Sequence, residues 1–189
     1  LQHPDDDLTD LCATIASGRN AWPTRVALVV SDRASLIADL RTLATGELPP
    51  AAIAGPDDGP TSELRVAMLF TGQGSQTPGM ARALHTALPL FRAAFDRVAA
   101  ELDPHLARPL ASIIFSTDDP SIHDTGNAQP ALFALEYALA ETWRALGVEP
   151  CALLGHSIGE LTAACVAGVM SLPDAARLVA ARGRLMQSL

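Results

Sequence analysis

The sequence predicts an α/β protein whose main part is a parallel sheet flanked by helices. Strand-like apolar runs alternate with helical stripes from residue 64 onward, and this alternation is typical of a parallel sheet. A G-x-S-x-G turn at residues 155–159 stands between an apolar run and an apolar, helix-like segment. Residues 48–60 hold four prolines, two glycines and two aspartates, so we expect a linker between the main part and a smaller α/β module before it.

The smaller module is expected to hold two helices and one strand. Apolar residues recur at helical spacing over residues 7–17, and residues 26–30 form an apolar run typical of a fully buried strand. Ser31 and Asp32 can cap a second helix, which Gly46 would end. Because one strand between two helices cannot form a stable sheet, we expect the module to use strands from a neighbouring domain or from preceding chain.

The main part begins with a predicted strand at residues 64–70, which runs into a glycine-rich loop at residues 71–76 and then into a helix. Two helical stripes follow, one formed by Phe91, Phe95, Val98 and Leu102 and the other by Leu132, Leu135, Leu139, Trp143 and Leu146. The second stripe leads into the strand before Ser157. Ligand sites in such folds lie beyond the carboxyl ends of the strands, where both the glycine-rich loop and Ser157 are expected.

The last helix is expected to begin at Ser171, because a proline follows closely and Asp174 stands three residues on. Its predicted apolar stripe is formed by Leu178, Ala181, Leu185 and Met186. Arg182 lies in the middle of this stripe. A permanently charged guanidinium on an inward face needs an anionic partner, which is either an acid of the fold or the carboxylate of a ligand.

Ser157 is expected to be an exposed nucleophile. A sharp strand-to-helix turn pushes the serine out of the sheet, and Gly155 and Gly159 leave room for the strained backbone. Ile158 then begins a helix, so its free backbone N–H can point at an oxyanion beside Ser157. His156 adjoins the nucleophile but should point away from it on a tight turn, which favours a supporting structural role over that of a base.

Composition excludes several classes of function. The net charge is −8, whereas nucleic acid or an anionic membrane would need a basic face. The chain has no lysine, which removes lysine-based catalysis from this stretch. It has no apolar run of about 18 residues or more and no basic signal region, so we expect a cytoplasmic protein. The three cysteines, Cys12, Cys151 and Cys165, lack metal-type spacing, so buried free thiols and no metal site are expected.

Four motifs stand in order along the chain. They are Phe-Thr-Gly-Gln73-Gly-Ser-Gln, Ala-Gln129-Pro-Ala-Leu, Gly-His-Ser157-Ile-Gly-Glu and Arg182-Gly-Arg-Leu-Met-Gln. Together they resemble the malonyl-CoA:acyl-carrier-protein transacylase family, most closely the acyltransferase domains of modular type I polyketide synthases. The resemblance covers residues 62–189 and implies part of an α/β-hydrolase-like large subdomain. Residues 1–58 resemble the later part of the linker between ketosynthase and acyltransferase.

The resemblance implies a role for each site residue. Ser157 would take the acyl group from coenzyme A as an ester, and the backbone N–H groups of Gln73 and Ile158 would form the oxyanion hole. Arg182 would grip the free carboxylate of a malonyl-type extender unit, with Gln73 also at the substrate. The implied mechanism is ping-pong: coenzyme A leaves, and the phosphopantetheine thiol of an acyl carrier protein then attacks the acyl-serine. No cofactor bound to the domain itself is implied.

The extender unit and the partners also follow from the resemblance. Ile158 and the segments at residues 129–136 and 182–187 are similar to malonyl-selecting domains, whereas methylmalonyl-selecting relatives often carry glutamine in place of Ile158. Malonyl-CoA is therefore the expected substrate, with a methylmalonyl-selecting domain or a fatty acid synthase malonyl/acetyl transferase as alternatives. Implied partners are an acyl carrier protein and an adjacent ketosynthase in a homodimeric synthase of antibiotic biosynthesis.

The family's general base is a histidine far beyond the nucleophile, and the sequence ends at Leu189 before reaching it. The ferredoxin-like small subdomain would also lie largely in the missing part. We therefore expect a fragment that does not turn over malonyl-CoA alone, because serine is a weak nucleophile without a base. Two other classes stay open: a serine hydrolase such as a thioesterase, which shares the turn, and a non-catalytic synthase module.

Overall fold

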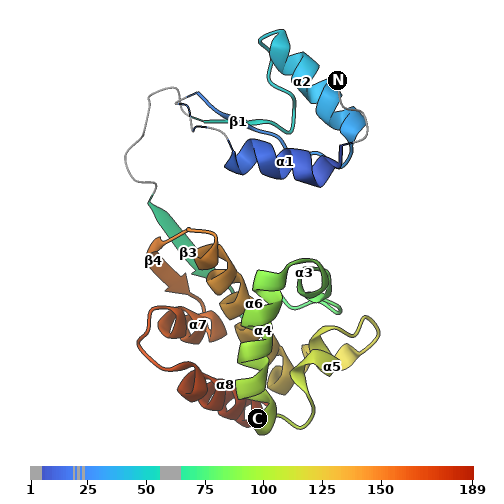
Figure 1. Cartoon of the computed structure of the whole chain (residues 1–189). Coiled ribbons are helices and arrows are strands. Elements are labelled where there is room, and N and C mark those ends of the chain that lie inside the picture. Colours follow the sequence, from blue (N-terminus) through green and yellow to red (C-terminus); the bar gives the residue numbers. More distant parts are fainter. Residues whose placement is uncertain (1–5, 19, 21, 23, 56–64) are drawn as a thin grey trace. The chain divides into compact units, whose positions relative to one another are not determined.

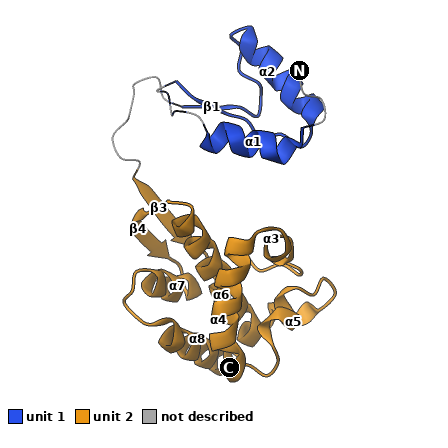
Figure 2. Ribbon diagram, viewed as in Figure 1, with its two compact units in different colours: residues 1–64 blue, residues 65–189 orange. Residues whose placement is uncertain are grey.

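The computed structural model describes residues 6–18, 20, 22, 24–55 and 65–189. Contacts between residues divide the chain into two compact units, residues 1–64 and residues 65–189 (Figure 2). No helix among the described residues combines the length and the apolar character that crossing a membrane requires.

Unit 1 (residues 1–64) contains two helices, α1 (Leu8–Ser17) and α2 (Arg33–Ala44), and two very short strands, β1 (Val26–Ala27) and β2 (Ile53–Ala54). The strands form an antiparallel pair in which Val26 lies opposite Ala54. Asp7 caps α1 by accepting the N–H groups of Thr9 and Asp10, and Asp32 caps α2 by accepting that of Ser35. The cap predicted at Asp32 is therefore confirmed.

The prediction of a fully buried strand over residues 26–30 is wrong. The strand ends at Ala27, and Val26 and Val29 are 39% and 79% exposed. Its partner β2 lies within the segment that composition marked as a linker, so the unit supplies its own second strand. Neither α1 nor α2 contains a buried residue, so neither helix is enclosed by the rest of the unit.

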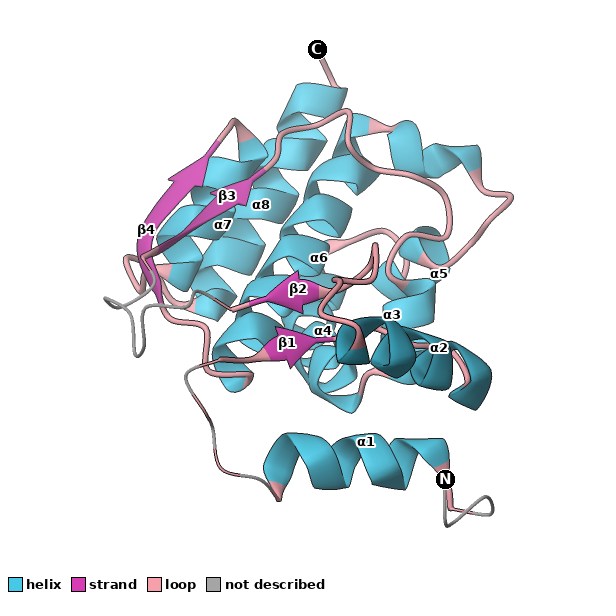
Figure 3. Ribbon diagram, turned by 90° about the horizontal axis from the view of Figure 1, so that it is seen from above, coloured by secondary structure: helices cyan, strands magenta, loops and turns pink. Residues whose placement is uncertain are grey.

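Unit 2 (residues 65–189) holds a parallel strand pair and most of the helices. Its elements are β3 (Val66–Phe70), α3 (Arg82–Ala87), α4 (Pro89–Leu102), the 3-10 turn η1 (Asp103–His105), α5 (Leu110–Ile114), the 3-10 turn η2 (Pro120–His123), α6 (Thr125–Ala145), β4 (Pro150–Gly155), α7 (Ile158–Val166) and α8 (Leu172–Gln187). The strands β3 and β4 run side by side and end together, with Phe70 opposite Gly155 (Figure 3). The predicted parallel sheet with flanking helices is confirmed, as two strands in the described part of the chain.

Helix α6 is central to unit 2, because it contacts α4, α7 and α8 (Figure 1). The predicted stripe of α4 is confirmed: Phe91, Phe95 and Val98 are at most 1% exposed. On α6 the predicted stripe is buried at Leu132 but reaches solvent at Trp143, which is 52% exposed. The apolar core therefore lies around α6, with buried side chains from α4, α5, α7 and α8, and it leaves the end of α6 exposed.

Helix α8 begins as predicted but buries a different face. Ser171 accepts the backbone N–H of Asp174 at 3.2 Å and so caps the helix. The predicted inward stripe is wrong, because Leu178 and Leu185 are 45% and 64% exposed. The buried residues are Ala175, Ala176, Val179, Ala180 and Gly183. Small side chains bring α8 close to α6, so that a Cβ on Gly183 would lie 3.4 Å from Gly126 Cα.

The cysteines occupy three different environments. Cys165 is buried, Cys12 is partly buried and Cys151 on β4 is exposed, so the expectation of a buried thiol is wrong for Cys151. The side chain of Cys151 lies on a strand with little cover, since its neighbour Ala152 is exposed too. Burial raises the pKa of the Cys165 thiol to about 11, which keeps it protonated and unreactive at neutral pH.

Candidate active site

Ser157 sits in a strained turn between β4 and α7. Its backbone angles are φ 51° and ψ −113°, a region that side-chain-bearing residues rarely occupy. Two glycines make the turn possible: a Cβ on Gly155 would lie 2.2 Å from the carbonyl carbon of Gly159, and one on Gly159 would lie 2.4 Å from Phe70 O. The expected nucleophile turn is thus present, with both glycines at close backbone contacts.

Arg182 on α8 reaches the serine. Its Nη2 donates to Ser157 Oγ at 3.1 Å, and its Nη1 donates to Gln129 Oε1 at 2.6 Å. Gln129 on α6 is fully buried, and its Nε2 is 3.4 Å from Met186 Sδ. Among the ion pairs of the described residues, none includes Arg182. The guanidinium therefore presents an uncompensated positive charge beside the serine hydroxyl, although the leucines around it on α8 are exposed.

The glycine-rich loop after β3 lies at the same edge of the sheet, because β3 and β4 end together. The loop is fixed by its side chains: Gln73 Nε2 donates to Thr125 Oγ1 at 3.1 Å, and Gln76 Oε1 accepts the Gly74 N–H at 2.8 Å. Gly74 has φ 117°, which favours glycine. Neither the backbone N–H of Gln73 nor that of Ile158 has an acceptor among the hydrogen bonds of the described residues. Two backbone donors thus remain free near the serine turn.

His156 packs on the glycine-rich loop. A Cβ on Gly72 would lie 2.4 Å from His156 Nδ1, so glycine is needed for this contact. The backbone N–H of His156 donates to Phe70 O at 3.1 Å, and no hydrogen bond of the described residues joins its ring to Ser157. A supporting role, in which His156 spaces the serine turn from the β3 loop, is what these contacts favour.

Glu136 is a buried polar residue that the sequence analysis did not single out. Its Oε1 accepts the backbone N–H of Thr71 at 2.6 Å and the Thr71 hydroxyl at 2.8 Å, and its Oε2 accepts the Thr162 hydroxyl at 2.9 Å. Burial raises the pKa of Glu136, and these hydrogen bonds partly oppose the rise. Gln129 and Glu136 stand seven residues apart on α6, and polar residues within a buried helical stripe are the signal that could have found both.

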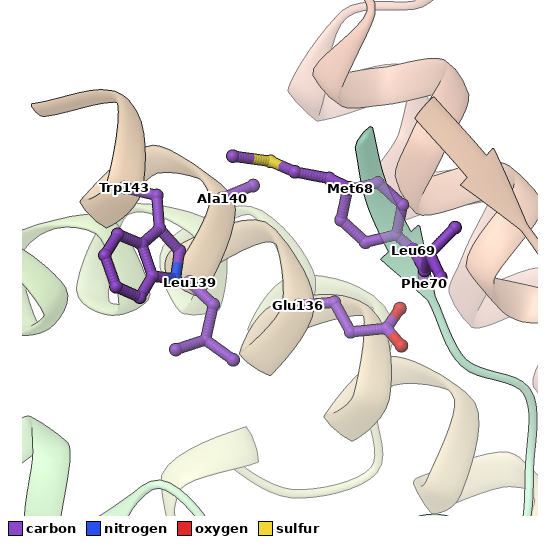
Figure 4. A pocket seen from close by; sticks show the side chains of 7 residues that line it. All are labelled: Met68, Leu69, Phe70, Glu136, Leu139, Ala140 and Trp143. Atoms are coloured by element: carbon purple, nitrogen blue, oxygen red, sulfur yellow. The ribbon is translucent and has the colours of Figure 1, made fainter. Parts of the chain in front are cut away.

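Glu136 also lines a pocket of about 200 Å³ (Figure 4). Apart from the glutamate it is lined by Met68, Leu69, Phe70, Leu139, Ala140 and Trp143. None of Ser157, Gln73 and Arg182 lines it, so this apolar pocket is separate from the serine site. Within the described part of the chain, no group of three or more His, Cys, Asp or Glu side chains is placed to hold a metal ion.

The structure brings Arg182 into contact with Ser157 and places the Gln73 loop at the same edge of the sheet. The serine turn supplies Ser157, Ile158, His156, Gly155 and Gly159, while Gln73 and Arg182 come from the β3 loop and from α8. The Ser157 hydroxyl is half-buried rather than exposed as expected. A hydroxyl beside free backbone donors and a cation without an acidic partner among the described residues suits covalent chemistry on a substrate that carries a negative charge.

Comparison with known proteins agrees with this chemistry. The family model described as "Acyl transferase domain" matches residues 67–189, and that described as "RhiE-like, KS-MAT linker domain" matches residues 1–47. A curated relative is the "Phenolphthiocerol synthesis polyketide synthase type I Pks15/1" of Mycobacterium marinum, which is 47% identical over 98% of this chain and 9% of its own length. The chain thus spans less than a tenth of that relative.

Solved structures give the same result. The acyltransferase domain from the second module of the salinomycin polyketide synthase is 44% identical, with a TM-score of 0.78 over 97% of this chain and 43% of that one. The malonyl-transacylase solved with a type II polyketide synthase acyl-carrier protein is 36% identical, with a TM-score of 0.59 over 66% of this chain and 40% of that one. The chain therefore belongs to the acyl transferase domain family of polyketide synthases and carries a KS-MAT linker before that domain.

Proposed function

We propose that Ser157 accepts an acyl group from a coenzyme A thioester and passes it to the phosphopantetheine thiol of an acyl carrier protein. The observation that carries this proposal is the contact of Arg182 with Ser157 Oγ at 3.1 Å, made by a guanidinium that has no acidic partner among the described residues. A cation at this distance suits an acyl group that ends in its own carboxylate. Malonyl-CoA is the substrate that we propose.

Arg182 is held for this task by Gln129. The buried Gln129 carbonyl accepts one N–H of the guanidinium at 2.6 Å and so fixes its plane, while the Nη2 side faces Ser157. A malonyl carboxylate would take hydrogen bonds from the Nη2 side, and its thioester carbonyl would then lie beside Oγ. Binding of the carboxylate would also draw the guanidinium away from the hydroxyl that must attack.

The free backbone N–H groups of Gln73 and Ile158 are proposed to stabilise the oxyanion that forms when Ser157 attacks the thioester. Removing one such donor typically costs about a hundredfold to a thousandfold in rate. Coenzyme A leaves as its thiol when the tetrahedral intermediate collapses to the acyl-serine. The carrier-protein thiol then attacks this ester, and Ser157 recovers its proton as the thioester forms.

A general base is still needed to take the Ser157 proton. The only hydrogen bond of Ser157 Oγ to the described residues comes from Arg182, which is a donor and cannot accept a proton. We propose that a histidine from the remaining part of an acyltransferase domain fills this role. We accordingly expect the 189 residues by themselves to give no turnover of malonyl-CoA.

The proposed setting is a type I polyketide synthase, with an adjacent ketosynthase joined through unit 1, a dimeric parent protein and a cytoplasmic location. We assign residues 1–58 to the linker and residues 62–189 to the acyltransferase. Support comes from the linker match at residues 1–47 and from the curated relative, which is a polyketide synthase. A methylmalonyl unit, or a place in a fatty acid synthase, would leave Ser157 and Arg182 with the same roles.

The test is incubation of a protein that carries the complete acyltransferase domain with radiolabelled malonyl-CoA. We expect a stable label on Ser157, located by peptide mass spectrometry, that a holo carrier protein removes as malonyl thioester. The Ser157→Ala variant is the matched control. Rapid release of free malonate without a thiol acceptor would instead indicate a hydrolase, and absence of any label would indicate a non-catalytic module.

A further inference from the structure

Among the described residues, Glu136 is the one buried carboxylate that touches both the β3 loop and α7, the two segments that flank the serine site. It lies on α6 with 8% of its surface exposed, and Figure 4 shows its carboxylate directed toward Phe70 at the end of β3. Oε1 accepts two hydrogen bonds from Thr71, from the backbone N–H at 2.6 Å and from the hydroxyl at 2.8 Å. Oε2 accepts the Thr162 hydroxyl at 2.9 Å. One carboxylate oxygen therefore binds the β3 loop, and the other binds α7.

Each of the two threonines lies close in the sequence to one of the two free backbone donors. Thr71 stands two residues before Gln73 in the β3 loop, and Thr162 stands one helical turn after Ile158 in α7. The Thr71 hydroxyl is also 2.8 Å from Ser75 Oγ, so the contact with Glu136 extends across the loop and encloses Gln73. Through one side chain, Glu136 thus connects the loop that carries one donor to the helix that carries the other.

These contacts suit a group with two acceptor oxygens. A carboxylate accepts all three hydrogen bonds at once, whereas a glutamine amide has one acceptor oxygen and one donor nitrogen, so the Thr162 hydroxyl would have to turn and accept instead of donating. No ion pair among the described residues includes Glu136, so the three hydrogen bonds alone compensate its burial. Burying a carboxylate costs free energy, so stability alone does not explain why Glu136 is buried here. A role in fixing the geometry of the segments that it contacts explains it better.

We propose that Glu136 is a positioning residue for acyl transfer, which sets the spacing between the Gln73 and Ile158 N–H groups by holding Thr71 and Thr162. This inference rests on the proposed function. It adds that the geometry of the oxyanion hole depends on a carboxylate that touches neither substrate nor nucleophile. Misplacing donors in this way weakens binding of the transition state more than binding of the substrate.

The experiment compares variants of a protein with the complete acyltransferase domain in steady-state transfer of the malonyl group from malonyl-CoA to a holo carrier protein. For Glu136→Gln we expect kcat to fall about tenfold to a hundredfold, with KM within about twofold of the parent, because misplacement by about 1 Å can cost this much. Glu141→Gln is the matched control. Glu141 lies on the same helix but pairs with Arg97 at 2.7 Å at the surface, so its variant should keep the parental kcat.

A second pair of variants tests the same link from its other end. Thr162→Val removes the hydroxyl at nearly constant shape, and we expect a several-fold loss of kcat. Thr162→Ser returns the hydroxyl and should recover most of that loss. In the double variant with Glu136→Gln and Thr162→Val, the loss of kcat, as a free energy, should be smaller than the sum of the two single losses, because both substitutions affect the same contact. If Glu136→Gln does not fold, the Thr162 pair alone decides.

Three outcomes would overturn the inference: parental kcat in Glu136→Gln or in Thr162→Val, a change confined to KM, or no recovery in Thr162→Ser. These outcomes differ from failure of the proposed function. If the parental protein itself forms no acyl-serine, the proposed function is wrong. If the parent is acylated and the variants match it, only the role of Glu136 is wrong.

Discussion

The α4 side of unit 2 and the Ser157 edge are built from opposite kinds of contact. On the α4 side, Phe91 and Phe95 are at most 1% exposed, and their rings lie 6.1 Å apart. At the Ser157 edge the side chains that hold the site are polar, and they are Gln129 and Glu136 on the facing helix α6. Apolar packing is non-directional, whereas hydrogen bonds fix orientation. The α4 side should therefore govern stability, and the Ser157 edge should govern activity.

The largest expected effect is on activity alone, in the Ser157→Ala variant. Loss of the nucleophile should abolish the covalent acyl label, as in serine hydrolases where its removal costs on the order of a million-fold in kcat. The free energy of unfolding should change by no more than about 0.5 kcal/mol, because the hydroxyl is not part of the apolar core. Peptide mass spectrometry and thermal unfolding measure the two quantities.

The backbone at Ser157 sharpens this prediction. Since φ is 51° there, Ser157→Gly should relieve strain and raise the free energy of unfolding by about 1 kcal/mol, again without any label. A stabilised but inactive variant would mean that the turn is held for activity at the expense of stability. A marked loss of stability in both variants would contradict the separation of the two regions.

The converse effect is expected for Phe95→Ala on the α4 side. Removing this side chain, which is 1% exposed, should lower the free energy of unfolding by about 3 to 5 kcal/mol. Trp143→Ala is the matched control, because Trp143 is 52% exposed and should cost about 1 kcal/mol or less. Denaturant unfolding measures both. If acyl labelling per folded molecule also fell in Phe95→Ala, the core and the edge would not be separable.

A smaller effect is expected for Arg182→Ala at the Ser157 edge. It should lower kcat/KM for malonyl-CoA about a hundredfold, or ~2.7 kcal/mol, and leave transfer from acetyl-CoA unchanged, because acetyl lacks the carboxylate. Arg184→Ala is the control, as Arg184 is exposed on the same helix. Initial rates with both substrates measure the effect. Equal losses with acetyl-CoA and malonyl-CoA would argue that Arg182 only supports the fold.

The contrast between apolar packing and polar contacts also explains which features could be predicted from the sequence. Large apolar residues at helical spacing predicted the buried face of α4, and local patterns predicted the cap at Ser171 and the turn at Ser157. The face of α8 was predicted wrongly, because its leucines are exposed while Ala176 and Gly183 pack against the fold. Small residues give a weak periodic signal, although they are the ones that allow helices to pack closely.

The sequence pattern could not predict the polar contacts between residues that lie far apart in the chain. The bond between Glu136 and Thr71 joins residues 65 positions apart, and that between Arg182 and Gln129 joins residues 53 apart. Spacing along one helix predicted that Arg182 needs a partner but not that it would share its two nitrogens between Gln129 and Ser157. Such pairs depend on how α6, α7 and α8 pack, and local sequence does not determine that.

The smallest effect is expected where polar contacts lie at the surface. The Ser121 hydroxyl and backbone N–H, together with the Arg108 guanidinium, lower the pKa of Asp119 from 3.8 to about 2. A lowered pKa in the folded state means that this carboxylate contributes stability above pH 3.8, and that the contribution is lost as the pH falls toward about 2. Asp119→Asn should therefore show a shallower loss of stability across this window than the parent.

Thermal unfolding between pH 4 and pH 2 tests this, with Ser121→Ala as a second variant that keeps the carboxylate but removes the Ser121 hydroxyl. Ser121→Ala should reduce the same pH dependence in part. Identical pH dependence in all three proteins would mean that these surface contacts contribute nothing measurable. The Asp119 side chain is 20% exposed, whereas Glu136 is buried. A measurable effect at Asp119 would therefore show that the polar contacts of unit 2 act in two ways: contacts nearer the surface adjust stability, and the buried contacts fix the site.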